Sequence, residues 1–242
     1  MAKRMSRSTN ESKHTAFSYW IGIIAIIVEF ILGIRYVNSP DPFEQTFATV
    51  TLIESFLGFI GWISLDPLYG VRREKFYKPD KFKPLVAGTL FLGFGMLIIL
   101  ALEQTILLRV PLTIRNIEIA GAIIFAGPCE ELFFRGLLVG SSDKLGRNFE
   151  GIPVKIKTSS YNVDKELNPV VLLGIFISTI MFTLLHQNYA ENRIYILVTF
   201  ISGLILAIFF WIFEDITANI IAHVTLNIIA VYQTFYMVQL FS

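Results

Sequence analysis

The chain has 242 residues, of which 54% are hydrophobic and 16% are charged. An ordinary soluble domain carries about 25% charged residues, so much of this chain must have lipid as its solvent. The net charge of +1 gives no reason to expect a nucleic-acid partner. Cys129 is the single cysteine, which excludes an internal disulfide and any multi-cysteine zinc site. These properties predict an integral protein of the cell membrane.

Residues 1–16 form a polar, basic tail, and an apolar stretch of about twenty residues follows it. That stretch is too long for a typical signal-peptide core, and no clear small-residue cleavage site follows it. We therefore expect it to be retained as the first of several spans.

Seven windows are long and apolar enough to cross a hydrocarbon core of about 30 Å. They are residues 17–38, 45–66, 84–107, 116–140, 169–188, 194–213 and 217–241. The sequence therefore predicts an all-α fold, a polytopic membrane helix bundle of about seven transmembrane helices, with eight possible.

Basic residues predict the orientation of the bundle. Fifteen of the twenty Lys and Arg residues lie in the tail and in the loops after the second and fourth spans. These three segments share one side of a seven-span protein. Because Lys and Arg are retained in the cytoplasm, we expect the N-terminus inside and the C-terminus outside.

The fourth span contains two adjacent acids and a base: Glu130, Glu131 and Arg135. A charge at membrane depth costs several kcal/mol unless it is paired or hydrated, so each is a candidate functional residue. Glu131 and Arg135 are four residues apart, share a helix face and can neutralise each other. Glu130 points about 100° away and has no local partner, as a general base would. The alternative is a Glu-Glu-Arg cluster that only holds helices together.

Two later spans carry polar residues at helical spacing. One stripe in the fifth span consists of Ser178, Phe182 and His186. In the seventh span, His223 and Asn227 are four residues apart. Together with Glu130, these groups supply a base, a proton carrier and two donors for a developing oxyanion. This is the equipment of water-mediated acyl hydrolysis.

The three patterns resemble the motifs of the CPBP membrane proteases, which include the type II CAAX prenyl endopeptidases. The family motifs Glu-Glu-x-x-x-Arg, Phe-x-x-x-His and His-x-x-x-Asn stand here, in the family order, as Glu130-Glu131…Arg135, Phe182…His186 and His223…Asn227. The resemblance covers about residues 116–230. We therefore divide the chain into the tail, N-terminal transmembrane helices at 17–110 and a catalytic transmembrane core at 116–242.

The resemblance implies an intramembrane endopeptidase that hydrolyses a peptide bond of a membrane-associated protein or peptide. The corresponding site residues are Glu130, Glu131, Arg135, His186, His223 and Asn227. The first acid and first histidine would activate water, and the second histidine and the asparagine would form the oxyanion site. The second acid and the arginine would orient them. No cofactor and no nucleic acid are expected. The partners would be the bilayer and a membrane-embedded or lipidated substrate, such as a prenylated protein, a bacteriocin or pheromone leader, or a membrane-anchored regulator.

A zinc-dependent metalloendopeptidase is the nearest alternative, with Glu130, His186 and His223 as the ligands. No His-Glu-x-x-His pair supports it, and sensitivity to chelators would distinguish the two mechanisms.

A transporter is the alternative from another class, because Glu29, Glu54 and Glu103 also lie in predicted spans. A transporter would favour matched broken helices in two halves, and none is evident. The complete motif set argues against an inactive scaffold, and Cys129 is more simply a packing residue than a nucleophile.

The predicted depths of the site residues disagree. At about 1.5 Å per residue, Glu130 and His223 lie at similar depths, whereas His186 falls near the outer end of its span. Either the fifth helix starts deeper or tilts, or Gly127-Pro128 breaks the fourth span. The loop at 141–168 is also unusually long.

Overall fold

The structure is a computed structural model that describes residues 16–69, 114–157, 162–186 and 193–236. The predicted third span at 84–107, with Glu103, lies outside the described residues. So do the basic loop that follows the second span and nearly all of the predicted tail.

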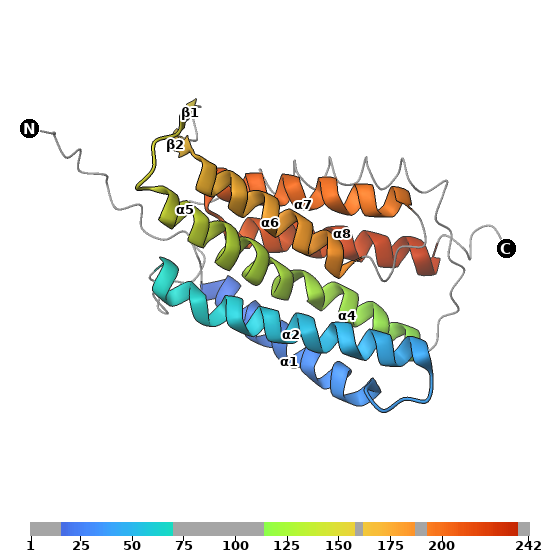
Figure 1. Ribbon diagram of the computed structural model, residues 1–242. Coiled ribbons are helices and arrows are strands. Elements are labelled where there is room, and N and C mark those ends of the chain that lie inside the picture. The colour runs from blue at the N-terminus through green and yellow to red at the C-terminus, as the bar shows by residue number, and fades with distance from the viewer. Residues whose placement is uncertain (1–15, 70–113, 158–161, 187–192, 237–242) are drawn as a thin grey trace, which may run out of the picture.

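The described chain is mostly helical (Figure 1). In chain order, its elements are α1 (Ala16–Tyr36), α2 (Pro42–Tyr69), α4 (Ile114–Glu130), the π-helix η2 (Glu131–Val139), α5 (Gly140–Gly146), β1 (Ile152–Lys157), β2 (Asn162–Leu167), α6 (Pro169–Leu185), α7 (Arg193–Phe213) and α8 (Ile216–Tyr236). The rod formed by α4, η2 and α5 lies between the α1–α2 pair and the group of α6, α7 and α8 (Figure 1). The π-helix packs against α2, α6, α7 and α8, so four helices surround the segment that begins at Glu131.

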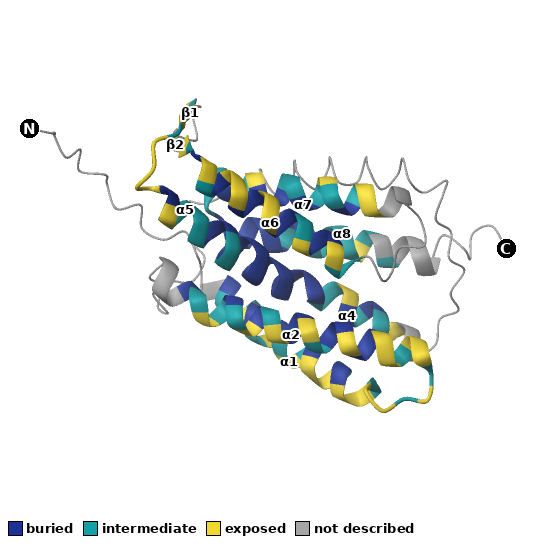
Figure 2. Ribbon diagram, viewed as in Figure 1, coloured by how far each residue is buried: buried dark blue, intermediate teal, exposed yellow. Residues whose placement is uncertain are grey.

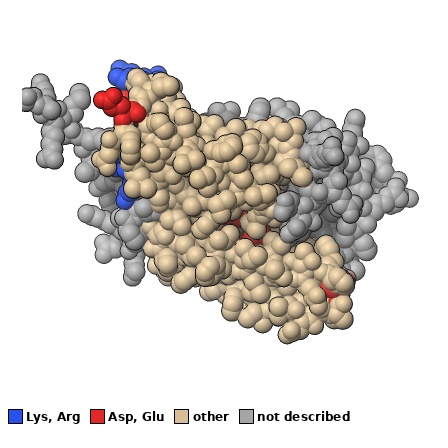
Figure 3. Space-filling view, in the orientation of Figure 1, with Lys and Arg blue, Asp and Glu red and all other residues tan. Residues whose placement is uncertain are grey.

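Three helices are long and apolar enough to cross a membrane: Ser18–Tyr36, Pro42–Leu65 and Ile196–Phe213. Pro169–Leu185 and Ile216–Ile229 are apolar but shorter. The charged side chains visible in Figure 3 gather mainly at the end that carries the strands, while the helical flanks are largely uncharged. This surface suits lipid, so the prediction of a helical membrane protein is confirmed. Seven spans and a cytoplasmic N-terminus stay predictions.

A β-hairpin occupies the long loop, and the all-α prediction did not include it. Strands β1 and β2 pair antiparallel, with Ile152 opposite Leu167 and Lys157 opposite Asn162. Ile152, Val154 and Ile156 alternate with other residues, which is the pattern of a strand with one apolar face. The prediction missed this period because the segment was treated only as a connection between spans.

Burial is concentrated along α4 and η2 (Figure 2). The buried residues of η2 are Glu131, Leu132, Phe133, Phe134, Arg135, Gly136 and Val139. Two of these, Glu131 and Arg135, carry charge at zero exposure, so this buried segment contains charged groups. Since burying a charge without a partner is costly, this segment must supply partners from the helices around it.

Candidate active site

The acid pair lies at a change of helix type. The predicted single helix at 116–140 is not broken at Gly127-Pro128, because α4 continues through Pro128 to Glu130. From Glu131 the backbone is a π-helix, a rare form that is frequent at functional sites. One of its carbonyls, that of Phe134, accepts a hydrogen bond from the Ser178 hydroxyl of α6 at 2.8 Å. The motif thus sits on locally irregular backbone that a neighbouring helix supports.

Glu131 and Arg135 form the predicted ion pair, with 3.1 Å between Oε1 and Nη1 and no exposure of either side chain. Arg135 Nη2 also donates to the Gly203 carbonyl of α7 at 3.2 Å. The guanidinium lies 4.3 Å from the centre of the Phe182 ring, within cation–π range. Arg135 therefore links η2 to both α6 and α7.

Glu131 has partners on both of its oxygens. His223 Nδ1 lies 2.9 Å from Oε1, and Asn219 Nδ2 donates to Oε2 at 3.1 Å. The Asn219 amide also donates to the Leu206 carbonyl at 2.9 Å, so it joins η2, α7 and α8. This carboxylate is held as a buried charge is expected to be, by a cation and by hydrogen bonds.

Glu130 is in the opposite condition, although it is the adjacent residue. Its side chain is 1% exposed, and neither carboxylate oxygen has a hydrogen-bond partner. His186 Nε2 lies 3.7 Å from Oε1, and His223 Nε2 lies 3.5 Å from Oε2. These distances are too long for strong direct hydrogen bonds, and a water that contacts both groups from the side would satisfy them.

The orientation of both histidines follows from their other nitrogens. His223 Nδ1 faces a carboxylate and His186 Nδ1 lies 2.8 Å from the Phe182 carbonyl, and both of these oxygens can only accept. We therefore assign the proton to Nδ1 in each neutral ring. Each neutral ring then presents an unprotonated Nε2 to Glu130. Three groups with free lone pairs converge on one point, which calls for a proton donor, such as water, or a cation.

The structure resolves the conflict over the depth of His186. The Asn168 side chain, which caps the start of α6, donates to the Gly146 carbonyl at the end of α5 at 2.7 Å. Glu130 precedes Gly146 by sixteen residues, and His186 follows Asn168 by eighteen residues. At about 1.5 Å per residue, both are about 25 Å from the contact between Gly146 and Asn168. His186 does lie at the end of α6, and the apparent mismatch with Glu130 disappears because the helix that carries Glu130 continues past 140 to Gly146.

Asn227 is not gathered into this cluster. It lies one turn beyond His223 on α8, and its side-chain amide donates to the Ile123 carbonyl of α4 at 2.6 Å. The structure therefore brings together the other five predicted site residues and leaves Asn227 beside them.

Two contributors were absent from the predicted site. Asn219 binds Glu131, and Ser178 supports the π-helix. The sequence did contain a signal for Asn219, because it stands four residues before His223 and extends the same stripe. Ser178 was recognised on the stripe of His186, but its role depends on a π-helix that spacing did not predict.

The zinc alternative has a suitable donor set in Glu130, His186 and His223. Among the described residues, however, no three His, Cys, Asp or Glu side chains are arranged closely enough to hold a metal ion. Cys129 is fully buried and lies against Gly58 of α2, in keeping with a packing role.

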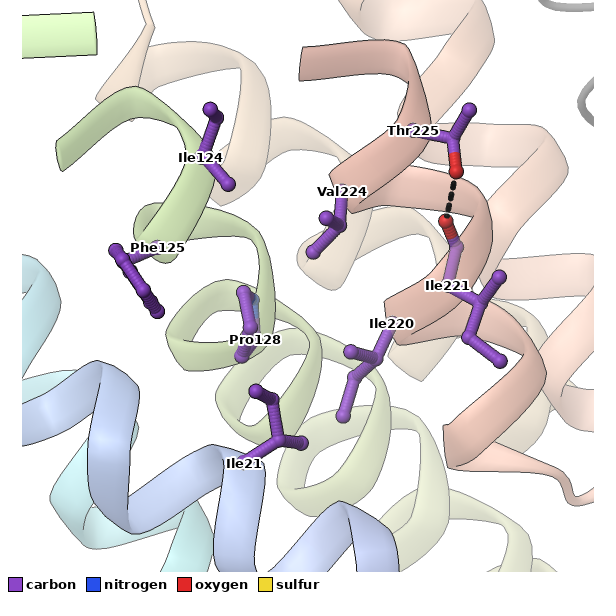
Figure 4. A pocket seen from close by; sticks show the side chains of 8 residues that line it. All are labelled: Ile21, Ile124, Phe125, Pro128, Ile220, Ile221, Val224 and Thr225. Atoms are coloured by element: carbon purple, nitrogen blue, oxygen red, sulfur yellow. Dashed lines mark hydrogen bonds between the residues drawn. The ribbon is translucent and has the colours of Figure 1, made fainter. Parts of the chain in front are cut away.

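An apolar pocket of about 230 Å³ lies between α1, α4 and α8 (Figure 4). Its lining residues are Ile21, Ile124, Phe125, Pro128, Ile220, Ile221, Val224 and Thr225. The only polar side chain is that of Thr225, which donates to the Ile221 carbonyl. Pro128 is two positions before Glu130, about 160° around the helix, so this pocket is not the space that Glu130 faces.

Apolar helices that surround a buried acid and two facing histidines are the arrangement expected of an intramembrane protease. The comparison with protein families points to the same class. Residues 113–229 match the family described as type II CAAX prenyl endopeptidase Rce1-like, and this match supports the CAAX protease family for that segment of the chain. No curated protein and no solved structure matches the chain. The matched segment contains all six predicted site residues and excludes α1 and α2.

Proposed function

We propose that this protein is an intramembrane endopeptidase in which Glu130 and His186 activate a water for attack on a peptide bond of a prenylated, membrane-associated substrate. The observation that carries the proposal is the state of Glu130. It is a buried carboxylate without a hydrogen bond, and it faces the Nε2 atoms of two histidines.

The reaction requires one water and returns every catalytic group to its starting state. A water between Glu130 and His186 gives a proton to Glu130 while its oxygen attacks the peptide carbonyl. Glu130 then passes this proton to the leaving nitrogen, and the carbon–nitrogen bond breaks. The water oxygen remains in the new carboxyl group.

The tetrahedral intermediate needs donors for its negative oxygen, and α8 supplies two candidates. His223 can donate from Nε2 when its ring is protonated, and Glu131 at Nδ1 stabilises that cation. Asn227 would have to turn from the Ile123 carbonyl toward the substrate. Arg135 keeps Glu131 in place, so the roles of Glu131 and Arg135 are to orient and to balance charge.

The test is cleavage by the purified full-length chain in liposomes of a farnesylated peptide with a CAAX terminus. The same peptide without the lipid serves as the substrate control. We expect cleavage of the prenylated peptide, no effect of a chelator and loss of activity in His186→Ala. No cleavage of either peptide would overturn the proposal. Activity that a chelator removes and zinc restores would assign the site to a metal.

A further inference from the structure

Two buried acids lie outside the matched family segment. Glu29 on α1 has no exposure, and neither of its oxygens has a hydrogen-bond partner. Glu54 on α2 is 8% exposed. Neither forms a salt bridge among the described residues. Buried acids without a cation are costly at membrane depth, so their position calls for an explanation.

Close packing brings Glu54 toward the catalytic acid. Along one face of α2, residues 54, 58, 61 and 65 recur at helical spacing. A Cβ on Gly58 would lie 2.7 Å from Cys129 Cβ, and one on Gly61 would lie 2.4 Å from the Leu132 backbone. Leu65, further along, reaches Gly136. This stripe therefore follows α4 and η2 in the same direction, and Glu54 is its polar end beside the turn that carries Glu130.

Helix α1 completes the same layer. The Ser55 hydroxyl donates to the Ile26 carbonyl at 3.0 Å, and the Trp62 indole donates to the Tyr19 carbonyl at 3.1 Å. These contacts align α1 antiparallel to α2 and place Glu29 at the level of Glu54. Glu29, Glu54 and Glu130 interact electrostatically with one another, and Glu54 lies within hydrogen-bonding reach of Glu130.

We propose that Glu54 is a neutral carboxylic acid that donates a hydrogen bond to the Glu130 carboxylate and positions it for catalysis. This makes α2 part of the active site, and the inference rests on the proposed role of Glu130 as the base.

The charges around Glu130 explain why Glu54 is the neutral partner. The ionisable groups that face Glu130 are Glu29 from α1, Glu54 from α2, His186 from α6 and His223 from α8. Arg135 also acts on Glu130, but Glu131 already pairs with it at 3.1 Å. Adjacent carboxyl groups of this kind share protons rather than ionise together. Glu130 has the histidines beside it, and the geometry therefore favours Glu54 as the partner that keeps the proton.

The positioning role also fits the open hydrogen-bonding capacity of Glu130. Neither of its oxygens accepts a well-formed bond in this conformation. A donor from α2 would fix the carboxylate while leaving the other lone pairs for the water. A carboxylate that is free to rotate is a poor base, because attack requires the water to be aligned.

Two substitutions of similar size separate positioning from packing. Glu54→Gln keeps a donor in its amide, and we expect kcat within about threefold of the wild-type value. Glu54→Leu removes the donor, and we expect kcat to fall about 10- to 100-fold with KM nearly unchanged. Ser55→Ala, the matched control on the next residue of α2, should keep wild-type kcat. Equal kcat in the Gln and Leu variants would overturn the positioning role.

Infrared spectroscopy tests the protonation of Glu54 without any substrate. The protein in liposomes should show a carboxylic-acid carbonyl band that is lost in Glu54→Gln. The same band should shift in Glu130→Gln, because its hydrogen-bond acceptor changes from a carboxylate to an amide. A spectrum unchanged by Glu54→Gln would overturn the inference. Absence of cleavage with these bands present would instead contradict the proposed function and leave the Glu54–Glu130 bond supported.

Discussion

The two halves of the described bundle treat buried charge differently. In the family segment, Glu131 has Arg135, His223 and Asn219 as partners, and the guanidinium reaches α6 and α7 as well. In the α1–α2 pair, Glu29 has no partner at all within hydrogen-bonding geometry. Glu130 stands where the two halves meet. In the family segment, the charge of Glu131 is stabilised by an ion pair and by hydrogen bonds. The α1–α2 pair instead places further carboxyl groups around Glu130, the residue proposed to move a proton.

Replacement of Glu130 should have the largest effect on the cleavage rate, because it removes the proposed base. Glu130→Gln should lower the cleavage rate by about 10²- to 10⁴-fold, the usual contribution of general acid–base catalysis. Thermal unfolding should change little, since Glu130 forms no pair with Lys or Arg among the described residues and an amide carbonyl can still accept the hydrogen bond proposed from Glu54. Cleavage within a few-fold of wild type would remove Glu130 from the role of base.

Replacement of Glu131 should have the opposite profile. Glu131→Gln leaves Arg135 as a buried charge without its carboxylate and should destabilise the fold by about 3–5 kcal/mol. The measurement is chemical or thermal unfolding in detergent. The double variant Glu131→Gln, Arg135→Met should recover part of this stability, because no unpaired cation remains. A Glu131→Gln protein as stable as Glu130→Gln would contradict the proposed difference between the adjacent acids.

The contact between the halves can be tested by adding one carbon atom. Gly61→Ala would place a Cβ 2.4 Å from the Leu132 backbone and should cost about 1–3 kcal/mol through overpacking. Gly121→Ala is the matched control, because nothing lies within 4 Å of a Cβ there. Unfolding measurements should show a loss only for Gly61→Ala. Equal stabilities would mean that α2 does not lie against η2 as the structure shows.

The support of the π-helix gives the smallest expected change. Ser178→Ala removes the 2.8 Å hydrogen bond to the Phe134 carbonyl and should cost about 0.5–1.5 kcal/mol. Thr179→Val is a suitable control, because the Thr179 hydroxyl bonds only within its own helix, to Ile175. If Ser178→Ala is no less stable than Thr179→Val, the Ser178 hydroxyl does not stabilise the π-helix.

The sequence predicted the residues of the site better than their surroundings. Glu130, Glu131 and Arg135 were recognised because helical spacing and the cost of a buried charge need no knowledge of the fold. The ion pair was predicted for the same reason, and its 3.1 Å contact is what that spacing implies. The roles assigned to these residues stay predictions.

The features that sequence reasoning missed depend on contacts between distant segments. The depth of His186 depends on Gly146 and Asn168, which are far apart in the chain and touch only after folding. The predicted fourth span also ended at 140, so α5, which begins at Gly140, was not expected. Glu54 has no motif neighbour, so only the packing of Gly58 and Gly61 against α4 and η2 connects it with Glu130.

A crystal structure of the protein in a lipid phase, with data collected at the zinc absorption edge, would test the central claim most directly. The claim is that a water, not a metal, bridges Glu130 and His186, whose facing atoms are 3.7 Å apart. We predict a water-sized density feature within hydrogen-bonding distance of both side chains, without an anomalous peak. An anomalous zinc peak among Glu130, His186 and His223 would contradict the account.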